Sequence, residues 1–588
     1  MPDLLLEVGT GEMPIDVLSA LASDLSRRAG EAISENGLLG DGIRVLYTLR
    51  RLVFIMRNVT GQRLGGEEVI NTISRVLGGI MAALTSERAI RRDASPADFI
   101  LPIRYLVCLY GEQVIPVRAR NVTADRVTRG HWRTHREESI ALPSPAGYEQ
   151  ALAGGGVVVD PERRKQMVSN AVTAAAHEEN VSAQIDDDLL VKIADAVEYP
   201  QPVIGRVNLP SDLRVTFANA ALREAGFVPL DAGQGSDIRF VGFADGAMEQ
   251  DVVRVGYERV ARSALRGCKL LFSRDRKASL ADHVRSLRGI DGELGLGSLW
   301  EKTERLRTLA GQIAQAIDAS PGTVDRAAFL SQADRATWIV RAFPSLHGIA
   351  GATYAVLDGE ESSVCIALEE GALSISNGIP GASEGLAIAI ARSYDDLCSR
   401  LLTGSDMHDP QVIGVVDDLI ALMVGGKVDL DLLSLLAPVS EQFNIFAPVM
   451  KTEELGKRLR TCLEERLVEY IETSEKITSP IASAIPQEVR ANPYRSSACA
   501  RALHEASGGE DFSLLLGSFE RLRALLPAGS TRAFDPALFE GESERALWRA
   551  YLKAEGKLEA FLTKLDYAQA IDQLITLGSA IDRYTKDI

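Results

Sequence analysis

The chain has 588 residues, 46% of them hydrophobic and 25% charged, and its 64 Lys and Arg against 81 Asp and Glu give a net charge of −17 at pH 7. This composition indicates a globular protein of about three to five domains. It argues against a membrane protein, because no uncharged apolar run approaches the ~18 residues that cross a bilayer. It also disfavours nucleic-acid binding, except by a local basic patch. The amino terminus has acids at Asp3 and Glu7 and no basic segment, so we expect no signal peptide and a cytoplasmic location.

The first 248 residues alternate strand-like and helix-like patterns. Residues 3–9 (DLLLEVG) are a short apolar run, residues 43–59 are rich in β-branched and aromatic side chains, and residues 102–122 read as two strands joined by a turn at Gly111. In the last segment apolar residues alternate with Arg118 and Arg120, which predicts that these arginines share one face of a strand.

A basic strip occupies residues 118–138, RARNVTADRVTRGHWRTHREE. It holds six arginines and two histidines before Glu137, and Asp125 is its only earlier acid. Arginine binds phosphate through a planar fork of N–H donors, and Trp132 offers a surface on which RNA bases stack. The alternative is an exposed face whose charges pair with acids elsewhere in the chain.

From about residue 252 the pattern becomes helical. Leucines and isoleucines recur at helical spacing over residues 299–317, and Ser298 with Glu301 has the spacing of a capping box. Residues 371–383 indicate a flexible connection. From about residue 441 the chain is helical almost throughout, and one apolar stripe comprises Leu455, Leu459, Leu463, Leu467 and Ile471.

The sequence contains no motif of a catalytic or metal site at the expected spacing. The P-loop, dinucleotide-binding, zinc-protease and hydrolase-nucleophile patterns are missing. The six cysteines lie far apart without a CxxC pair, which indicates buried free thiols. His408-Asp409 resembles the metal-binding pair of HD-type phosphohydrolases, with His347 as another possible ligand. A solvated turn before Pro410 is the interpretation that we favour, because a metal site needs further ligands.

Several colinear motifs resemble the β subunit of the bacterial heterotetrameric glycyl-tRNA synthetase. LLLEVGTGEMP is similar to the family's L-x-x-E-I-G-T-E-E-L-P, TLRRL to T-P-R-R-L, and RVTRGHW to its R-G-H-R-F stretch. VVVDPERRKQMV, VEYPQPVIG and LLFSRDRKASL also match family blocks. FPSLHGIAGATYAVLDGE and DFSLLLGSFERLRAL follow in the same order, so that the resemblance covers nearly the whole chain.

The resemblance implies a division of labour. In this family the α subunit activates glycine and binds ATP with Mg, the β subunit binds tRNA(Gly), and the enzyme is an α2β2 assembly. We therefore expect no cofactor and no catalytic residue on this chain, an α subunit and tRNA(Gly) as partners, and no association with a membrane.

The chain also departs from the family's pattern. A long segment is missing between Gln62 and Glu67, as is an aromatic block near residues 222–230. Arg392 stands where the family has an aspartate, and Glu520 stands where it has a lysine. Gly414 and Val415 replace two basic residues, and after AIDRYTKDI the family continues with one more helix. Because several losses fall on charged positions, an assembly partner of the α subunit that has lost tRNA binding is the main alternative. The HD-type phosphohydrolase is the other.

We expect a multidomain α+β protein with three parts. Residues 1–248 form an α/β body with the basic strip, residues 249–440 a helical HD-like domain, and residues 441–588 a helical domain like those that bind anticodons. The predicted tRNA contacts are first Arg118, Arg120, Arg126, Arg129, His131, Trp132, Arg133 and Arg136, and second Arg50, Arg51, Arg521 and Arg523.

Overall fold

A computed structural model describes residues 1–61, 66–83, 103–119, 121–135, 139–183, 185–231, 237–443, 451–525, 536, 539 and 541–587. The chain forms two compact units, residues 1–273 and 274–588. The helix α7 (Gln250–Asp275) runs to the boundary between them. The predicted divisions after residues 248 and 440, and the likeness of the helical parts to HD and anticodon-binding domains, stay predictions. No helix in these described ranges is both long and apolar enough to cross a membrane.

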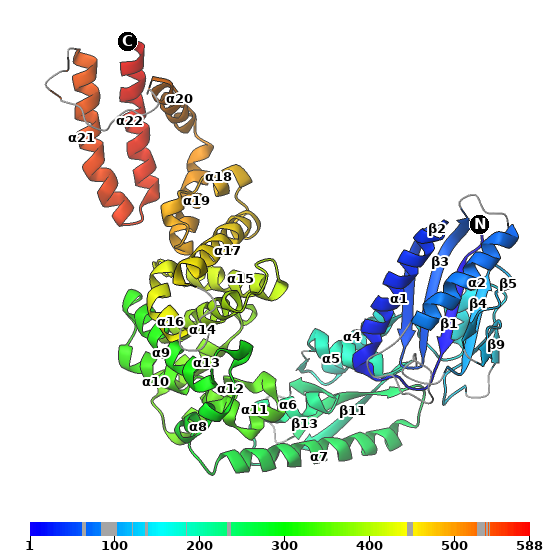
Figure 1. Ribbon diagram of the computed structural model, residues 1–588. Helices are drawn as coiled ribbons and strands as arrows, with labels where there is room; N and C mark the ends of the chain where they lie inside the picture. Colours follow the sequence, from blue (N-terminus) through cyan, green and yellow to red (C-terminus); the bar gives the residue numbers. More distant parts are fainter. Residues whose placement is uncertain are drawn as a thin grey trace. The chain divides into compact units, whose positions relative to one another are not determined.

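The first unit is built on a five-stranded antiparallel sheet with the strand order β2-β3-β1-β4-β5. Its strands are β1 (Leu4–Gly9), β2 (Leu38–Thr48), β3 (Arg51–Gly61), β4 (Tyr105–Tyr110) and β5 (Gln113–Val114). The helices α1 (Ile15–Glu35) and α2 (Gly66–Ala83) cover one face (Figure 1). The strands predicted at residues 3–9 and 43–59 are therefore confirmed, the second as the pair β2 and β3. Of the two strands predicted over residues 102–122, the first is β4, whereas the second is interrupted after Val114, because residues 115–117 lie outside any strand. The predicted turn at Gly111 is confirmed too, where a φ of 57° is easily reached by glycine.

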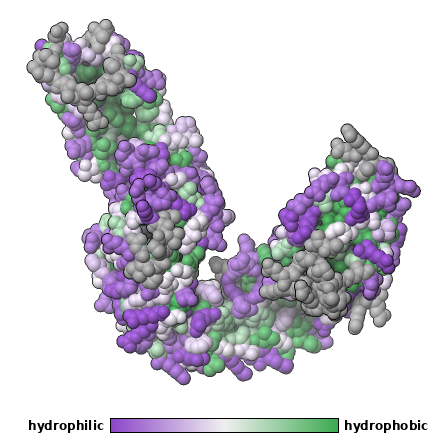
Figure 2. All heavy atoms as spheres, viewed as in Figure 1, coloured by the Kyte–Doolittle hydropathy of each residue, from purple (hydrophilic) through white to green (hydrophobic). Residues whose placement is uncertain are grey.

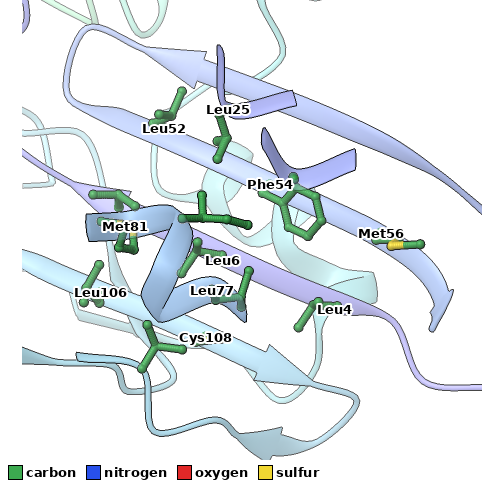
Figure 3. Close-up of a cluster of buried hydrophobic side chains, with 14 of the residues drawn as sticks. Leu4, Leu6, Leu25, Leu52, Phe54, Met56, Leu77, Met81, Leu106 and Cys108 are labelled. Carbon is green, nitrogen blue, oxygen red and sulfur yellow. The ribbon is translucent and has the colours of Figure 1, made fainter. Parts of the chain in front are cut away.

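Strand β1 lies at the centre of this sheet, and all six of its residues are buried. Because side chains alternate along a strand, Leu4 and Leu6 point into the core beneath α1 and α2 (Figure 3). Leu5 points to the opposite face, where it packs against the helix α3 (Tyr148–Gly154). Glu7 lies on that second face as well and is fully buried, so its carboxylate needs partners inside the protein.

A second sheet of the first unit has the strand order β10-β12-β13-β11. Its strands are β10 (Ser182–Ala183), β11 (Pro200–Asn208), β12 (Val228–Asp231) and β13 (Asp237–Asp245). The helices of this part are α4 (Pro161–Glu178), α5 (Asp187–Ala196) and α6 (Val215–Glu224), besides α7. Three short strands lie within the basic strip. β6 (Arg118–Ala119) pairs with β7 (Val122–Thr123), and β8 (Val127–Arg129) pairs with β9 (Ser139–Ala141), which directly follows the strip.

The described elements of the second unit are all helical (Figure 1). Those discussed below are α8 (Leu280–Ser286), α9 (Leu299–Ala316), α11 (Trp338–Ala342), α12 (Ile349–Asp358), α14 (Ser383–Leu402), α15 (Pro410–Gly425), α17 (Thr452–Thr473), α20 (Glu510–Leu525), α21 (Glu542–Thr563) and α22 (Tyr567–Asp587). The capping box of Ser298 with Glu301 at the start of α9 is confirmed. The buried stripe on α17 is confirmed as well. The chain is thus a mixed α+β protein, as predicted.

Polar and apolar side chains are unevenly distributed over the surface of the second unit. Figure 2 shows hydrophilic side chains over much of the visible face of the helices α9 to α17, and more apolar colour among the last three helices. Leu514, Phe519 and Leu552 on α20 and α21 are exposed by half or more. All six cysteines of the chain are buried and free, as predicted.

Candidate functional site

A buried polar network in the first unit joins segments that are far apart in sequence. Its centre is Arg51, the first residue of β3, which is only 2% exposed. The Arg51 guanidinium donates to Glu7 Oε1 at 3.2 Å and to Glu198 Oε1 at 3.1 Å. It also donates to the backbone oxygen of Arg129 at 3.0 Å, and Thr48 donates its hydroxyl to Glu198 at 2.7 Å. Arg51, Glu7, Thr48 and Glu198 form what we call the Arg51 network.

A second set of contacts, centred on Asp245, fixes the position of Trp132. Asp245 is the last residue of β13, and its Oδ2 accepts from Trp132 Nε1 at 3.2 Å. Its Oδ1 accepts the backbone N–H of Glu198 at 2.6 Å and lies 3.0 Å from His131 Nε2. Arg50 reaches Asp245 at 3.3 Å and lies over the Trp132 ring, with 4.6 Å between its Cζ and the ring centroid.

The turn that carries His131 and Trp132 is packed tightly against glycines. The backbone N–H of His131 donates to the oxygen of Gly155 at 2.8 Å. A Cβ at Gly156 would come within 2.9 Å of the His135 ring, and one at Gly246 within 2.8 Å of the His131 ring. Both glycines also have a positive φ, so larger residues would be strained there. The GGG at residues 154–156 therefore ends a helix and also lets the His131–Trp132 turn pack directly against its backbone.

The electrostatics of the site favour the charged forms of Asp245 and Arg51. Burial raises the pKa of Asp245, but the contact with His131 and the backbone N–H groups of Glu198 and Tyr199 outweigh it and lower the pKa to about 2. Burial likewise disfavours a charged Arg51, but the adjacent Glu198, Tyr105 and Glu7 hold its pKa well above the usual value. Arg51 therefore stays a cation inside the fold, and Asp245 stays an anion at the base of the Trp132 turn.

Outside this network lie arginines that no carboxylate neutralises. Arg118, Arg129 and Arg133 are exposed, and none of them forms an ion pair with a residue that the structure describes. The Arg129 guanidinium lies over the Tyr105 ring, with 5.8 Å between its Cζ and the ring centroid. Trp132, which precedes Arg133 in the sequence, is 44% exposed, even though Arg50 covers part of its ring. Arg126 is half-buried and donates to the backbone oxygen of Glu112 at 3.0 Å. These exposed arginines with one ordered indole are suited to phosphate groups and nucleobases.

The predicted contacts thus divide into several groups. Arg118, Arg129, Trp132 and Arg133 lie at the surface as expected, whereas Arg120 and Arg136 lie outside the described residues. Arg51 and His131 are buried, and Arg50 is largely enclosed by Glu12, Glu198 and Asp245, so a phosphate cannot reach Arg51 or His131 from solvent. In the second unit, Arg521 pairs with Asp582, and Arg523 is exposed on α20.

Sequence reasoning did not identify the acids of this site. Glu7 appeared only as evidence against a signal peptide, and Asp245 was not considered. Glu198 appeared only as part of the family motif VEYPQPVIG. A glutamate inside the apolar run LLLEVG was the one available signal, because a buried carboxylate requires a cationic partner.

In the second unit, the helices α9 and α14 are joined by two adjacent ion pairs. The Arg305 guanidinium binds Asp395 through two hydrogen bonds of 2.6 and 3.2 Å, and both side chains are buried. Lys302 binds Asp396 at 2.6 Å. Arg392, which stands where the resembling family has an aspartate, donates to the backbone oxygen of Leu373 at 2.9 Å. Burial lowers the pKa of this arginine, although Asp396 and Asp418 oppose the effect.

The two histidines considered as metal ligands have other neighbours. His347 lies 2.8 Å from Asp334, and His408 lies 3.3 Å from Asp406. Asp409 begins α15 by accepting the N–H of Gln411 at 2.8 Å, so the predicted turn before Pro410 is confirmed. Across the described part of the chain, no three His, Cys, Asp or Glu side chains are grouped so that they could hold a metal ion.

Comparison with known proteins identifies the class to which this fold belongs. The family model described as glycyl-tRNA synthetase beta subunit matches residues 61–486. The glycine–tRNA ligase beta subunit of Bacillus subtilis is 29% identical over 529 residues, which are 86% of this chain and 74% of that protein. That of Chromohalobacter salexigens is 28% identical over 543 residues, 89% of this chain and 77% of its own length. That of Halothermothrix orenii is 25% identical, with 100% of this chain and 94% of that protein covered.

These matches place the chain among the subunits of aminoacyl-tRNA synthetases, which are ligases. Within that class it belongs to the glycyl-tRNA synthetase beta subunit family. The motifs that carried the resemblance meet in space: LLLEVG supplies Glu7, TLRRL supplies Thr48, Arg50 and Arg51, RGHW supplies His131 and Trp132, and VEYPQP supplies Glu198.

Proposed function

We propose that this chain binds tRNA(Gly) and presents it to the α subunit of a glycine–tRNA ligase, in an α2β2 assembly in the cytoplasm. ATP with Mg would bind to the α subunit, where the adenylate forms, and no cofactor would bind to this chain. The observation that carries the proposal is that Arg118, Arg129 and Arg133 of the basic strip are exposed and form no ion pair with a described residue, on a protein whose net charge is −17.

The Arg51 network explains how such a group is held in place. The guanidinium of Arg51 anchors the strand β8 through the backbone oxygen of Arg129, and Asp245 anchors the Trp132 turn. These bonds order the backbone that carries Arg129 and Arg133 before any ligand arrives. Less conformational entropy is therefore lost when phosphates bind. Holding the tRNA in one orientation brings its terminal ribose to the α subunit, which raises the rate by proximity.

The test is to replace Arg129 and Arg133 by alanine and to measure tRNA(Gly) binding by fluorescence anisotropy at several salt concentrations. We expect Kd to rise about tenfold and the slope of log K against log salt to become shallower by about 1.5, since each phosphate contact contributes about 0.7–0.9. Arg259 and Arg266 on α7 are exposed and form no ion pair with any residue that the structure describes, so R259A/R266A is the charge-matched control. An unchanged slope in R129A/R133A would remove the basic strip from the interface.

A second candidate function follows from the charged positions that differ from the family. Glu520 and Arg392 replace a lysine and an aspartate of the resembling family, and Gly414 and Val415 replace two basic residues. An assembly partner that holds the α subunit without gripping tRNA would show this pattern. It predicts co-purification with the α subunit, together with no measurable binding of tRNA(Gly) by the isolated chain.

A further inference from the structure

A second basic cluster lies at Trp338 in the second unit. The family motif LLFSRDRKASL contributes two of its cations, Arg274 and Lys277, but these were not among the predicted tRNA contacts. The guanidinium of Arg274 lies over the indole ring, with 3.8 Å from its Cζ to the ring centroid. Arg341, three residues further along α11, lies over the same ring at 5.4 Å. Trp338 is nevertheless 37% exposed. We call Arg274, Lys277, Trp338 and Arg341 the Trp338 cluster.

The acidic residues next to the cluster bind other groups and not its cations. Asp275 accepts the backbone N–H groups of Trp338 at 2.8 Å and Ile339 at 3.0 Å, and it also accepts the hydroxyl of Tyr354 at 3.0 Å. Asp275 therefore caps α11 and ties it to the end of α7. Arg276 pairs with Asp358 at 2.5 Å. The segment SRDRK thus uses Asp275 and Arg276 inside the fold and leaves Arg274 and Lys277 at the surface.

None of the three cationic side chains in the cluster forms an ion pair within the described part of the chain. Arg274, Lys277 and Arg341 are all exposed. Like charges at short range repel each other, and the acidic surface of this protein offers many carboxylates that could have neutralised them. The indole compensates in part, because each guanidinium gains about 0.5–1 kcal/mol from an exposed cation–π contact. The two guanidiniums are therefore held in place by the indole, but no described carboxylate balances their charge.

We propose that the Trp338 cluster is a second contact for the tRNA backbone and that it binds phosphate groups. The stacked guanidiniums have few rotamers left to lose, and their N–H edges remain free for bidentate bonds to phosphate oxygens. Lys277 is exposed and donates its backbone N–H to the oxygen of Arg274 at 3.3 Å, so it adds a further positive charge one turn along the chain. This inference rests on the proposed tRNA binding and adds a contact in the second unit to that of the basic strip.

The experiment compares R274A/R341A with wild type in the same anisotropy titrations of tRNA(Gly) over a range of salt. We expect Kd to rise about tenfold and the salt slope to fall by about 1.5, because two phosphate contacts are lost. R274K/R341K keeps the charge but not the planar guanidinium, so its Kd for tRNA(Gly) should rise about threefold. R259A/R266A removes the same charge elsewhere and should change Kd less than twofold. Thermal unfolding of each variant shows whether α11 and its cap at Asp275 remain intact.

The outcomes separate this inference from the proposed function. If R274A/R341A binds like R259A/R266A while R129A/R133A is weakened, the Trp338 cluster is not an RNA contact, but the chain still binds tRNA. If R274A/R341A instead loses the α subunit in RNA-free co-purification and keeps its tRNA affinity, the cluster binds an acidic protein surface and the inference is wrong. If the wild-type chain binds no tRNA(Gly), both proposals fail.

Discussion

A single side chain, that of Asp245, holds several distant segments of the first unit together. Its carboxylate accepts the N–H groups of Glu198, Tyr199 and Trp132 and lies beside His131 and Arg50. These donors come from segments that are about 50 to 195 residues away in the sequence. Removing the charge would release the turn at Trp132 together with the start of β11, because both depend on the same two oxygens.

The lowered pKa of Asp245 makes a prediction about pH. A carboxylate whose pKa falls from 3.8 to about 2 on folding stabilises the protein above pH 4, and this contribution is lost as the pH falls toward 2. A shift of that size corresponds to about 2 kcal/mol. We expect Asp245→Asn to lower the free energy of unfolding by about this amount at pH 7, and the difference from wild type to shrink below pH 4. Urea unfolding at pH 7, 4 and 3 measures it; a constant difference would contradict the account.

The role of an arginine depends on neighbours that the sequence does not reveal. Arg50 and Arg51 are adjacent in TLRRL, and both were predicted to contact tRNA. The two-residue turn between β2 and β3 places Arg51 in the buried face of the sheet, where Glu7 and Glu198 neutralise it. These partners lie 44 and 147 residues away, so no local pattern could have distinguished it from the exposed Arg129.

At the scale of elements, regular periodicity was a reliable guide and short strands were not. The core strand β1 and the helices α9 and α17 follow from apolar spacing and a capping box, and the structure contains them. The strands β6 to β9 have only two or three residues each, which is too short to show a period. Of the strand face predicted for Arg118 and Arg120, the structure describes Arg118 alone.

The helices α9 and α14 allow a test of how burial affects the contribution of an ion pair to stability. Asp395 and Asp396 are neighbours, and each binds one cation of α9. Both members of the Arg305–Asp395 pair are buried, whereas the other pair joins the buried Lys302 to an aspartate that is 31% exposed. Breaking a buried ion pair costs about 3–5 kcal/mol, and the cost falls toward about 0–1 kcal/mol as solvent reaches both partners, so the Lys302–Asp396 pair lies between these limits.

We therefore expect Asp395→Asn to shift the urea midpoint of the helical signal, followed by far-UV circular dichroism, by more than Asp396→Asn does, because solvent can reach the Lys302–Asp396 pair from the side of Asp396. Both variants remove one negative charge, so a general electrostatic effect would be the same for both. Equal shifts would show that the buried pair does not hold α9 to α14.

At the scale of the whole molecule, charge is unevenly distributed over the chain. The chain carries a net charge of −17, yet among the described residues no carboxylate pairs with Arg129 and Arg133 of the basic strip in the first unit, or with Arg274 and Arg341 beside Trp338 in the second. An acidic body repels RNA at long range and leaves binding to such clusters, so the affinity should depend steeply on salt. The basic strip was visible in the sequence because its arginines all fall within residues 118–136. The Trp338 cluster was not, because Arg274 and Arg341 meet only through the cap of α11.

The central claim is that this chain makes tRNA(Gly) available to a catalytic partner. The most direct test is aminoacylation of tRNA(Gly) by the cognate α subunit, measured with and without this chain at saturating glycine and ATP. We predict strong stimulation by the wild-type chain, and a stimulation by R129A/R133A that is recovered only at higher tRNA concentration. If the chain binds the α subunit but leaves the rate of charging unchanged, tRNA presentation is wrong, and the chain is an assembly partner only.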